Sequence, residues 1–277
     1  MTTGTREFIS DRLKQLSREL NATYAEILTQ FFIERAVVRL VSNPVLYEHL
    51  IFKGGFVGLR VYGSPRFTTD LDAVTHRLDR IEVIRLAKEA MEKPTIDHVW
   101  FVFEREIELV TQSEYGGTRL QYRVGLGIPP SESRRSQIFN LDIGTGDPVT
   151  PGPKRENTRT TLGDGDISWR IYPIETIIAE KLHPLAKLGR DNSRSKDIFD
   201  LAFYLPNASS DILRKAIEKT FTYRGDELPA SFSAFLETLD RRMLRRGWKA
   251  ATANIQPTPD FDEAFETVVA RLRSMSI

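Results

Sequence analysis

The chain has 277 residues, of which 40% are hydrophobic and 28% are charged, and its formal net charge is +1. This composition is typical of a globular protein with a well-buried core, and the absence of cysteine excludes disulfides, thiolate zinc sites and a cysteine nucleophile. The chain begins with polar residues and no apolar run approaches the length of a membrane span, so we expect a cytoplasmic protein with no membrane partner.

The first half of the chain predicts a mixture of helices and strands. Residues 6–43 indicate two helices, and Thr23 followed by Glu26 predicts a capping box at the start of the second. The pattern breaks at Asn43-Pro44. Further along we expect a short apolar run at 50–52, helices at 55–62 and 79–92, strands at 69–75, 98–110, 117–126, 136–143 and 167–172, and a loop over 144–166.

The second half of the chain has a helical pattern from residue 173 onward. Pro184 falls inside the first of these helices and should kink it. The sequence therefore predicts an α+β fold, with an α/β domain and its N-terminal helices over 1–172 and a helical domain over 173–277. The expected helices of the second domain lie at about 173–188, 194–205, 209–222, 229–247 and 260–274.

Two aspartates separated by one residue lie in the predicted strand at 69–75. Side chains alternate between the faces of a strand, so Asp70 and Asp72 would share one face, with Cα atoms roughly 7 Å apart, while Leu71 points into the core. Like charges are held together favourably only when a cation lies between them, and magnesium prefers oxygen ligands. The pair therefore predicts a magnesium site, although a solvated turn or strand end shows the same spacing.

Two further features support a phosphate and metal site. Lys53-Gly54-Gly55 precedes a predicted helix, and paired glycines let backbone N–H groups approach phosphate oxygens; a tight turn with positive φ is the structural alternative. Asp142 lies within an apolar strand, where a charge is costly unless it is paired or metal-bound. An edge-strand aspartate facing water is the alternative there.

These pieces, in this order, resemble the nucleotidyltransferase superfamily, whose fold DNA polymerase β and the aminoglycoside nucleotidyltransferases share. The family pattern is a Gly-Gly or Gly-Ser turn, then two acidic residues separated by one apolar residue, then a third acidic residue between apolar ones. Phe56 follows the second glycine here, where the family commonly has a small or hydroxyl residue. The resemblance implies a polymerase-β-like core, which is a mixed sheet with flanking helices, followed by a helical C-terminal half.

The helical half adds two motifs. Lys181 lies on a predicted helix with an apolar flank and an acidic neighbour, from which a cation could reach a triphosphate; a surface lysine is the alternative. Asp197 and Asp200 lie on one face of the next helix, where they could orient a basic side chain or a base edge. Helix capping together with an Arg194–Asp197 pair would also explain them.

All of these motifs together resemble the AbiEii/AbiGii toxin family, the nucleotidyltransferase toxins of abortive-infection and type IV toxin–antitoxin systems. The resemblance spans about residues 50–205, and the motif that begins at Arg194 discriminates this family from the superfamily. The motifs are Lys53-Gly54-Gly55, Arg66 with Asp70 and Asp72, Glu180-Lys181, and Arg194-x-Lys196-Asp197-x-x-Asp200-Leu201.

The family resemblance implies a toxin that uses two Mg²⁺ ions to transfer nucleotides from a nucleoside triphosphate to an RNA acceptor, the 3′ end of tRNA, and so inhibits translation and growth. It also implies a cognate antitoxin. Asp70, Asp72 and Asp142 would hold the metals, and Asp142 would help to activate the acceptor hydroxyl. The remaining residues implied for nucleotide binding or catalysis are Lys53, Gly54, Gly55, Arg66, Lys181, Asp197 and Asp200.

Other readings of the sequence stay open. A small-molecule nucleotidyltransferase of the antibiotic-modifying kind would share the carboxylates, and so would a catalytically silent binding protein of the same fold. Thr68 lies two residues before Asp70, so a phosphate there would add negative charge beside the metal site. Two basic segments could bind RNA, or could be solvated surface: Lys187, Arg190, Arg194 and Lys196, and Arg241, Arg242, Arg245, Arg246 and Lys249.

Overall fold

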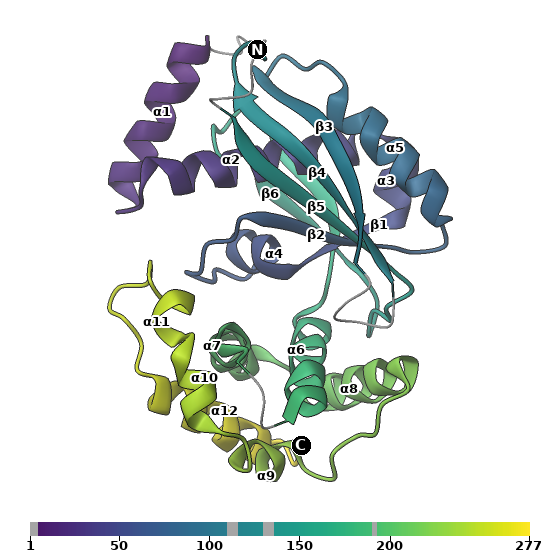
Figure 1. Cartoon of the computed structure of the whole chain (residues 1–277), viewed down its shortest axis with the longest axis vertical. Coiled ribbons are helices and arrows are strands. Elements are labelled where there is room, and N and C mark those ends of the chain that lie inside the picture. The colour runs from purple at the N-terminus through teal and green to yellow at the C-terminus, as the bar shows by residue number, and fades with distance from the viewer. Residues whose placement is uncertain (1–4, 110–115, 130–135, 190–192) are drawn as a thin grey trace. The chain divides into compact units, whose positions relative to one another are not determined.

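The computed structural model describes residues 5–109, 116–129, 136–189 and 193–277. The chain divides into two compact units, whose elements are drawn in Figure 1. The sheet unit comprises Met1–Tyr62, Phe67–Gly146 and Arg155–Ile171. The helical unit comprises Gly63–Arg66, Asp147–Lys154 and Tyr172–Ile277, so it includes two short segments from the first part of the chain.

The sheet unit is built on one mixed, seven-stranded sheet with the order β3-β4-β5-β2-β1-β7-β6. Strand β2 pairs antiparallel with β1 and parallel with β5, while β4 pairs antiparallel with both β3 and β5. Strands β1 and β7 are parallel. The strands are β1 Leu50–Lys53, β2 Asp70–Thr75, β3 Val99–Glu108, β4 Gly117–Leu126, β5 Gln137–Thr145, β6 Lys154–Arg159 and β7 Asp166–Ile171.

The helices of the sheet unit begin at side-chain caps, except the helix that begins at Gly54. Thr23 and Glu26 form the predicted capping box at the start of α2, which is thereby confirmed. Asn43 was expected only to break a helix, but its Oδ1 accepts hydrogen bonds from the N–H groups of Val45 and Leu46, and it caps the short helix α3. The helices are α1 Arg6–Glu19, α2 Tyr24–Val41, α3 Pro44–His49, α4 Gly54–Arg60 and α5 Arg80–Glu92.

Strand β6 contradicts the prediction of a loop over 144–166. All six of its residues are polar, and it lies at the edge of the sheet, where backbone pairing on one side holds a strand without apolar side chains. Beyond it, Glu34 of α2 is fully buried and accepts hydrogen bonds from Arg60 and from the backbone N–H of Thr161, each at 2.8 Å. A buried carboxylate therefore holds the β6–β7 connection to α2 and α4.

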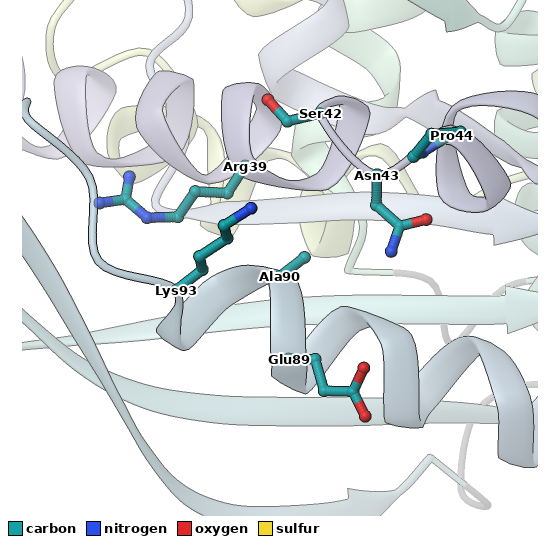
Figure 2. A pocket seen from close by; sticks show the side chains of 7 residues that line it. All are labelled: Arg39, Ser42, Asn43, Pro44, Glu89, Ala90 and Lys93. Carbon is teal, nitrogen blue, oxygen red and sulfur yellow. The ribbon is translucent and has the colours of Figure 1, made fainter.

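A pocket of about 280 Å³ in the sheet unit lies between α2, α3 and α5 (Figure 2). Arg39 and Lys93 line it from α2 and from the end of α5. The guanidinium of Arg39 donates to both carboxylate oxygens of Asp97 at 2.9 Å and to the carbonyl of Val99 at 2.7 Å. Arg39 is thus occupied in holding the segment before β3 against α2, which makes this arginine structural.

The helical unit has a core of apolar side chains from several helices. Leu182 of α6, Leu201 of α7 and Phe265 of α12 are fully buried. Helix α6 continues through Pro184 to Leu188. The helices are α6 Ile174–Leu188, α7 Ser195–Tyr204, α8 Ser210–Arg224, α9 Phe232–Glu237, α10 Arg241–Arg246, α11 Trp248–Ala251 and α12 Phe261–Ser274, with the 3₁₀ turn η2 at Leu205–Asn207.

A single helix over 229–247 was expected, and this prediction is wrong. Helix α9 ends at Glu237, and Asp240 begins α10 because its carboxylate accepts from the N–H of Arg242 at 2.8 Å. In the described part of the chain, no helix combines the length and the apolar character that crossing a bilayer requires.

Candidate functional site

Strand β2 places two aspartates on one face of the sheet. Leu71 is fully buried, and Asp70 and Asp72 on either side of it are partly exposed, as the strand alternation predicted. The side-chain amide of Asn140 on β5 donates to Oδ1 of Asp70 at 3.0 Å. Asp70 therefore has its orientation set by a neighbouring strand.

The parallel pairing of β2 with β5 brings the third predicted carboxylate to the same place. Asp72 is opposite Asp142 in the register, and Asp70 is opposite Asn140. On the other side, Asp72 is opposite Lys53 of β1. The sheet thus aligns Lys53, Asp72 and Asp142 on three adjacent strands, although they are far apart in the sequence.

Arg119 on β4 is a functional candidate that sequence reasoning missed. It is opposite Asp142 in the antiparallel β4–β5 pair, and its Nε and Nη2 donate to Oδ1 and Oδ2 of Asp142 at 2.7 and 2.8 Å. The hydrogen bond to Asp142, and the nearby charges of Asp70 and Asp72, raise the pKa of Arg119. A permanent cation therefore lies among the three carboxylates. Only the strand register could have identified it.

The glycine turn between β1 and α4 lies directly against this carboxylate cluster. Gly54 has φ +73°, and a Cβ atom at this position would lie 2.0 Å from Oδ2 of Asp72. A Cβ atom at Gly55 would lie 2.8 Å from Cβ of Thr68. Both glycines are needed because there is no room for a side chain, and the turn brings backbone close to Asp72.

Phe56 has a structural role that explains its departure from the family pattern. Its ring is almost fully buried and lies 5.8 Å from the ring of Trp169 on β7, which also lies 5.6 Å from the ring of Phe52 on β1. This aromatic cluster anchors the first turn of α4 to the sheet. The side chain at position 56 therefore points into the core, and only the backbone of the turn faces the cluster of aspartates.

Thr68 lies between the glycine turn and the aspartates. Its carbonyl accepts from the side-chain amide of Gln30 at 2.6 Å, and its hydroxyl donates to the carbonyl of Asp70 at 3.4 Å. Regulation by a phosphate on Thr68 stays a prediction.

The donor chemistry of the aspartate cluster fits a hard divalent cation. Asp70 and Asp72 offer carboxylate oxygens on one face, and these are the ligands that Mg²⁺ prefers. Asp142 is turned to Arg119, and among the residues that the structure describes no group of three or more histidine, aspartate or glutamate side chains is gathered to hold a metal. A metal at all three carboxylates would have to share Asp142 with Arg119 or displace Arg119 from it.

The helical unit brings together the other predicted residues. Lys181 on α6 lies 3.1 Å from Oδ1 of Asp197 and 2.5 Å from Oδ2 of Asp200, both on α7, so the predicted common face of these aspartates is confirmed. Arg66 donates through Nε and Nη2 to the two carboxylate oxygens of Asp200 at 2.9 and 2.8 Å. Arg194 also pairs with Asp197, as its structural interpretation predicted.

Burial and neighbouring charges shift the pKa values in opposite directions in the second cluster, which consists of Arg66, Lys181, Asp197 and Asp200. Burial would lower the pKa of Lys181, but Asp200 and Asp197 raise it overall. Burial would raise the pKa of Asp200, but Lys181 and Arg66 lower it overall. Arg66, Lys181 and Asp200 are therefore all charged at neutral pH, with Asp200 between the two cations and Asp197 as a second carboxylate beside Lys181.

Two of the basic residues in the segment over 187–196 are held in ion pairs within the helical unit. Lys187 pairs with Asp226 at 3.1 Å, and Arg194 is committed to Asp197. Lys196 is exposed, and Arg190 lies outside the described residues. The second basic segment, on α10 and α11, keeps its positive charges close together.

The mixed sheet, the same-face aspartates on β2 and the glycine turn are the features by which the sequence resembles a nucleotidyltransferase. The family model for the nucleotidyl transferase AbiEii toxin of type IV toxin–antitoxin systems matches residues 35–270, and the chain belongs to this family. The chain is therefore an enzyme of a toxin family, in which an antitoxin and a nucleoside triphosphate are implied as partner and substrate. Comparison with curated protein sequences gives no match.

Two solved structures from Helicobacter pylori share the fold. A suspected nucleotidyltransferase from H. pylori is 18% identical, with a TM-score of 0.54, over 90% of this chain and 94% of that chain. The protein JHP933 from H. pylori is 18% identical, with a TM-score of 0.52, over 88% of this chain and 89% of that chain. At this level of identity the likeness shows the fold alone.

Proposed function

We propose that this enzyme uses Mg²⁺ to transfer nucleotides from a nucleoside triphosphate to the 3′ end of an RNA, tRNA being the acceptor, and that the transfer inhibits translation and growth. The observation that carries the proposal is the register of β2 with β5, which aligns Asp72 with Asp142 and leaves Asp70 on the same face of β2. Nucleotidyl transfer needs little more from a protein than alignment of the reactants and neutralisation of charge.

Asp70 and Asp72 are the residues that would hold the metal, with Asp142 as the third ligand. Bound divalent cations would neutralise the triphosphate and lower the pKa of the attacking hydroxyl. The backbone of Gly54 and Gly55 would bind phosphate oxygens, since the turn has no side chains that block their approach. Lys53, next to the turn, would add a positive charge.

Arg66, Lys181, Asp197 and Asp200 are proposed to bind the nucleotide, as the family resemblance implies. Their own ion pairs support a rigid, preorganised cluster rather than mobile surface charges. Asp200 holds Arg66 in a two-pronged contact and holds Lys181 from the other side. Lys181 and Arg66 would then offer cationic N–H groups in fixed positions to a phosphate.

The test is a transfer assay with the full chain, Mg²⁺ and each of the four nucleoside triphosphates labelled on the α-phosphate. Label should enter bulk tRNA with at least one triphosphate, and Asp72→Ala should lower the rate on the order of 100-fold or more. Asp166→Ala is the matched control because Asp166 is exposed at the start of β7 and lies outside the cluster. Expression of Asp72→Ala should also leave bacterial growth unaffected.

Two outcomes would overturn parts of the proposal. Label that enters an aminoglycoside but no RNA would make the enzyme a small-molecule nucleotidyltransferase. Growth inhibition by Asp72→Ala equal to that of the wild type would show that toxicity does not depend on transfer.

A further inference from the structure

Helix α10 presents four arginines in two rows. Residues four apart lie on the same side of a helix, so Arg241 and Arg245 form one row, and Arg242 and Arg246 form the other. Together the four side chains line a pocket of about 530 Å³. The side chains that line this pocket all carry positive charge, so the surface around it is suited to anions.

The first row is fixed to α12. Arg241 pairs with Glu266 at 2.7 Å, and its guanidinium lies 4.3 Å from the centre of the Phe265 ring. Arg245 pairs with Asp262 in the same way, and lies over the ring of Phe261. These contacts hold two of the arginines in place and neutralise much of their charge.

The second row is free of such partners. Arg242 and Arg246 are exposed, and their side chains have no ion pair or hydrogen bond within the described ranges. Lys249 is exposed on the following helix, α11, and extends the positive surface. The three residues form what we call the arginine ridge: Arg242, Arg246 and Lys249.

The arginine ridge is firmly attached to the helix that carries Asp197 and Asp200. The hydroxyl of Ser195, in the first turn of α7, donates to the carbonyl of Leu244 on α10. A Cβ atom at Gly247 would lie 2.5 Å from this hydroxyl, so α10 and α7 are in close contact. A polyanion bound at the ridge would be held in a fixed position relative to α7.

We infer that the arginine ridge binds the phosphate backbone of the RNA acceptor; this rests on the proposed function. The charge favours a polyanion, and a guanidinium fork matches phosphate oxygens. A protein partner would need an apolar centre to its interface, but no large hydrophobic side chain of the described residues in α9 to α12 is exposed. Phe261 and Phe265 are buried beneath the arginines and cannot stack on bases, so binding at the ridge is independent of sequence.

The test compares two double variants of the full chain by fluorescence anisotropy. The probe is fluorescein-labelled bulk tRNA, without triphosphate, over a series of KCl concentrations. Arg242→Ala/Arg246→Ala should reduce the slope of log affinity against log salt by about 1.4 to 1.8, and weaken binding in 0.1 M KCl on the order of 30-fold. Lys215→Ala/Lys219→Ala, which removes the same charge from exposed positions on α8, should leave both values near the wild type.

Each result separates this inference from the proposed function. If Arg242→Ala/Arg246→Ala bound tRNA with the affinity and the salt slope of the wild type, the arginine ridge would not be an RNA-binding surface. This would hold even if the wild type transferred labelled nucleotide to tRNA. If the wild type bound tRNA, the double variant bound it more weakly, and no nucleotide was transferred to it, only the proposed function would be wrong. A wild type that binds no tRNA, or a double variant that loses only the binding of a purified acidic antitoxin, would overturn the ridge as an RNA surface.

Discussion

Arg119 and Asp142 face each other across β4 and β5 and form a two-pronged ion pair, with N–O distances of 2.7 and 2.8 Å. Asp142 lies opposite Asp72 on the other side. The family resemblance implies that Asp142 binds a metal, but in this structure Asp142 is paired with Arg119. Arg119 relieves the repulsion between the carboxylates, and under the proposed function it would compete with a metal for Asp142.

This competition predicts opposite effects of Arg119→Ala with and without metal. In EDTA the variant should lose about 1–2 kcal/mol of unfolding free energy, because a charge-assisted contact is removed and three carboxylates lose their counter-charge. Mn²⁺ should then bind about tenfold more tightly than in the wild type, measured by calorimetry. Arg123→Ala, on the same strand but paired with Glu104, is the control. Equal Mn²⁺ affinities in all three proteins would contradict the competition.

Gly54→Ala should inactivate the enzyme through Asp72. The new Cβ atom would fall 2.0 Å from the carboxylate oxygen, so either Asp72 or the turn must move. Gly63→Ala is a matched control, because Gly63 has φ +72° against +73° at Gly54 but has no atom within 4 Å of an added Cβ. Both variants should lose about 1 kcal/mol of stability from backbone strain. Only Gly54→Ala should lose nucleotide transfer; equal transfer by the two variants would show that the contact with Asp72 is not needed.

The buried cluster around Asp200 should contribute strongly to the stability of the helical unit. Asp200→Ala leaves Arg66 and Lys181 without their shared carboxylate, and we expect a loss of about 3 kcal/mol in the free energy of unfolding by urea. Asp211→Ala, which breaks an exposed pair with Arg214, should cost less than about 1 kcal/mol. Similar losses in the two variants would mean that the Asp200 pairs are no stronger than surface pairs.

Asp200 should also give the protein a pH-dependent stability. Its pKa is lowered in the folded state, so the stabilisation is fully present above the ordinary aspartate pKa of about 3.9, and is lost as the pH falls through the lowered value. Between about pH 4 and pH 2 the wild type should therefore lose more unfolding free energy than Asp200→Asn, which cannot titrate. If the unfolding free energies of the two proteins changed in parallel between about pH 4 and pH 2, the pH dependence would not come from Asp200.

Sequence patterns predict the individual strands and helices of this protein better than the way in which they pair and pack. Alternation along one strand was enough to place Asp70 and Asp72 on one face, because that property is local. The pairing of β2 with β5 and of β4 with β5 depends on strand order, which local patterns do not encode. Arg119 could therefore not be recognised, although its partner Asp142 was.

The same limit applies to the second cluster and to the misjudged segments. Arg66 meets Asp200 across 134 positions of sequence, and no periodicity links them. Strand β6 was missed because it is polar and is stabilised by its place at the sheet edge. The break between α9 and α10 depends on a cap at Asp240, which an apolar repeat over 229–247 conceals.

The close approach of Gly54 to Asp72 has a genetic consequence. Every amino-acid change that one nucleotide substitution can make in a glycine codon introduces a Cβ atom, and at Gly54 any Cβ atom collides with the carboxylate. Under the proposed function, a cell that carries this enzyme without its antitoxin would be under selection to inactivate it. The Gly54 codon would then be a target at which nearly any coding change lets the cell survive, while the buried aromatic anchor at Phe56 can keep the protein folded.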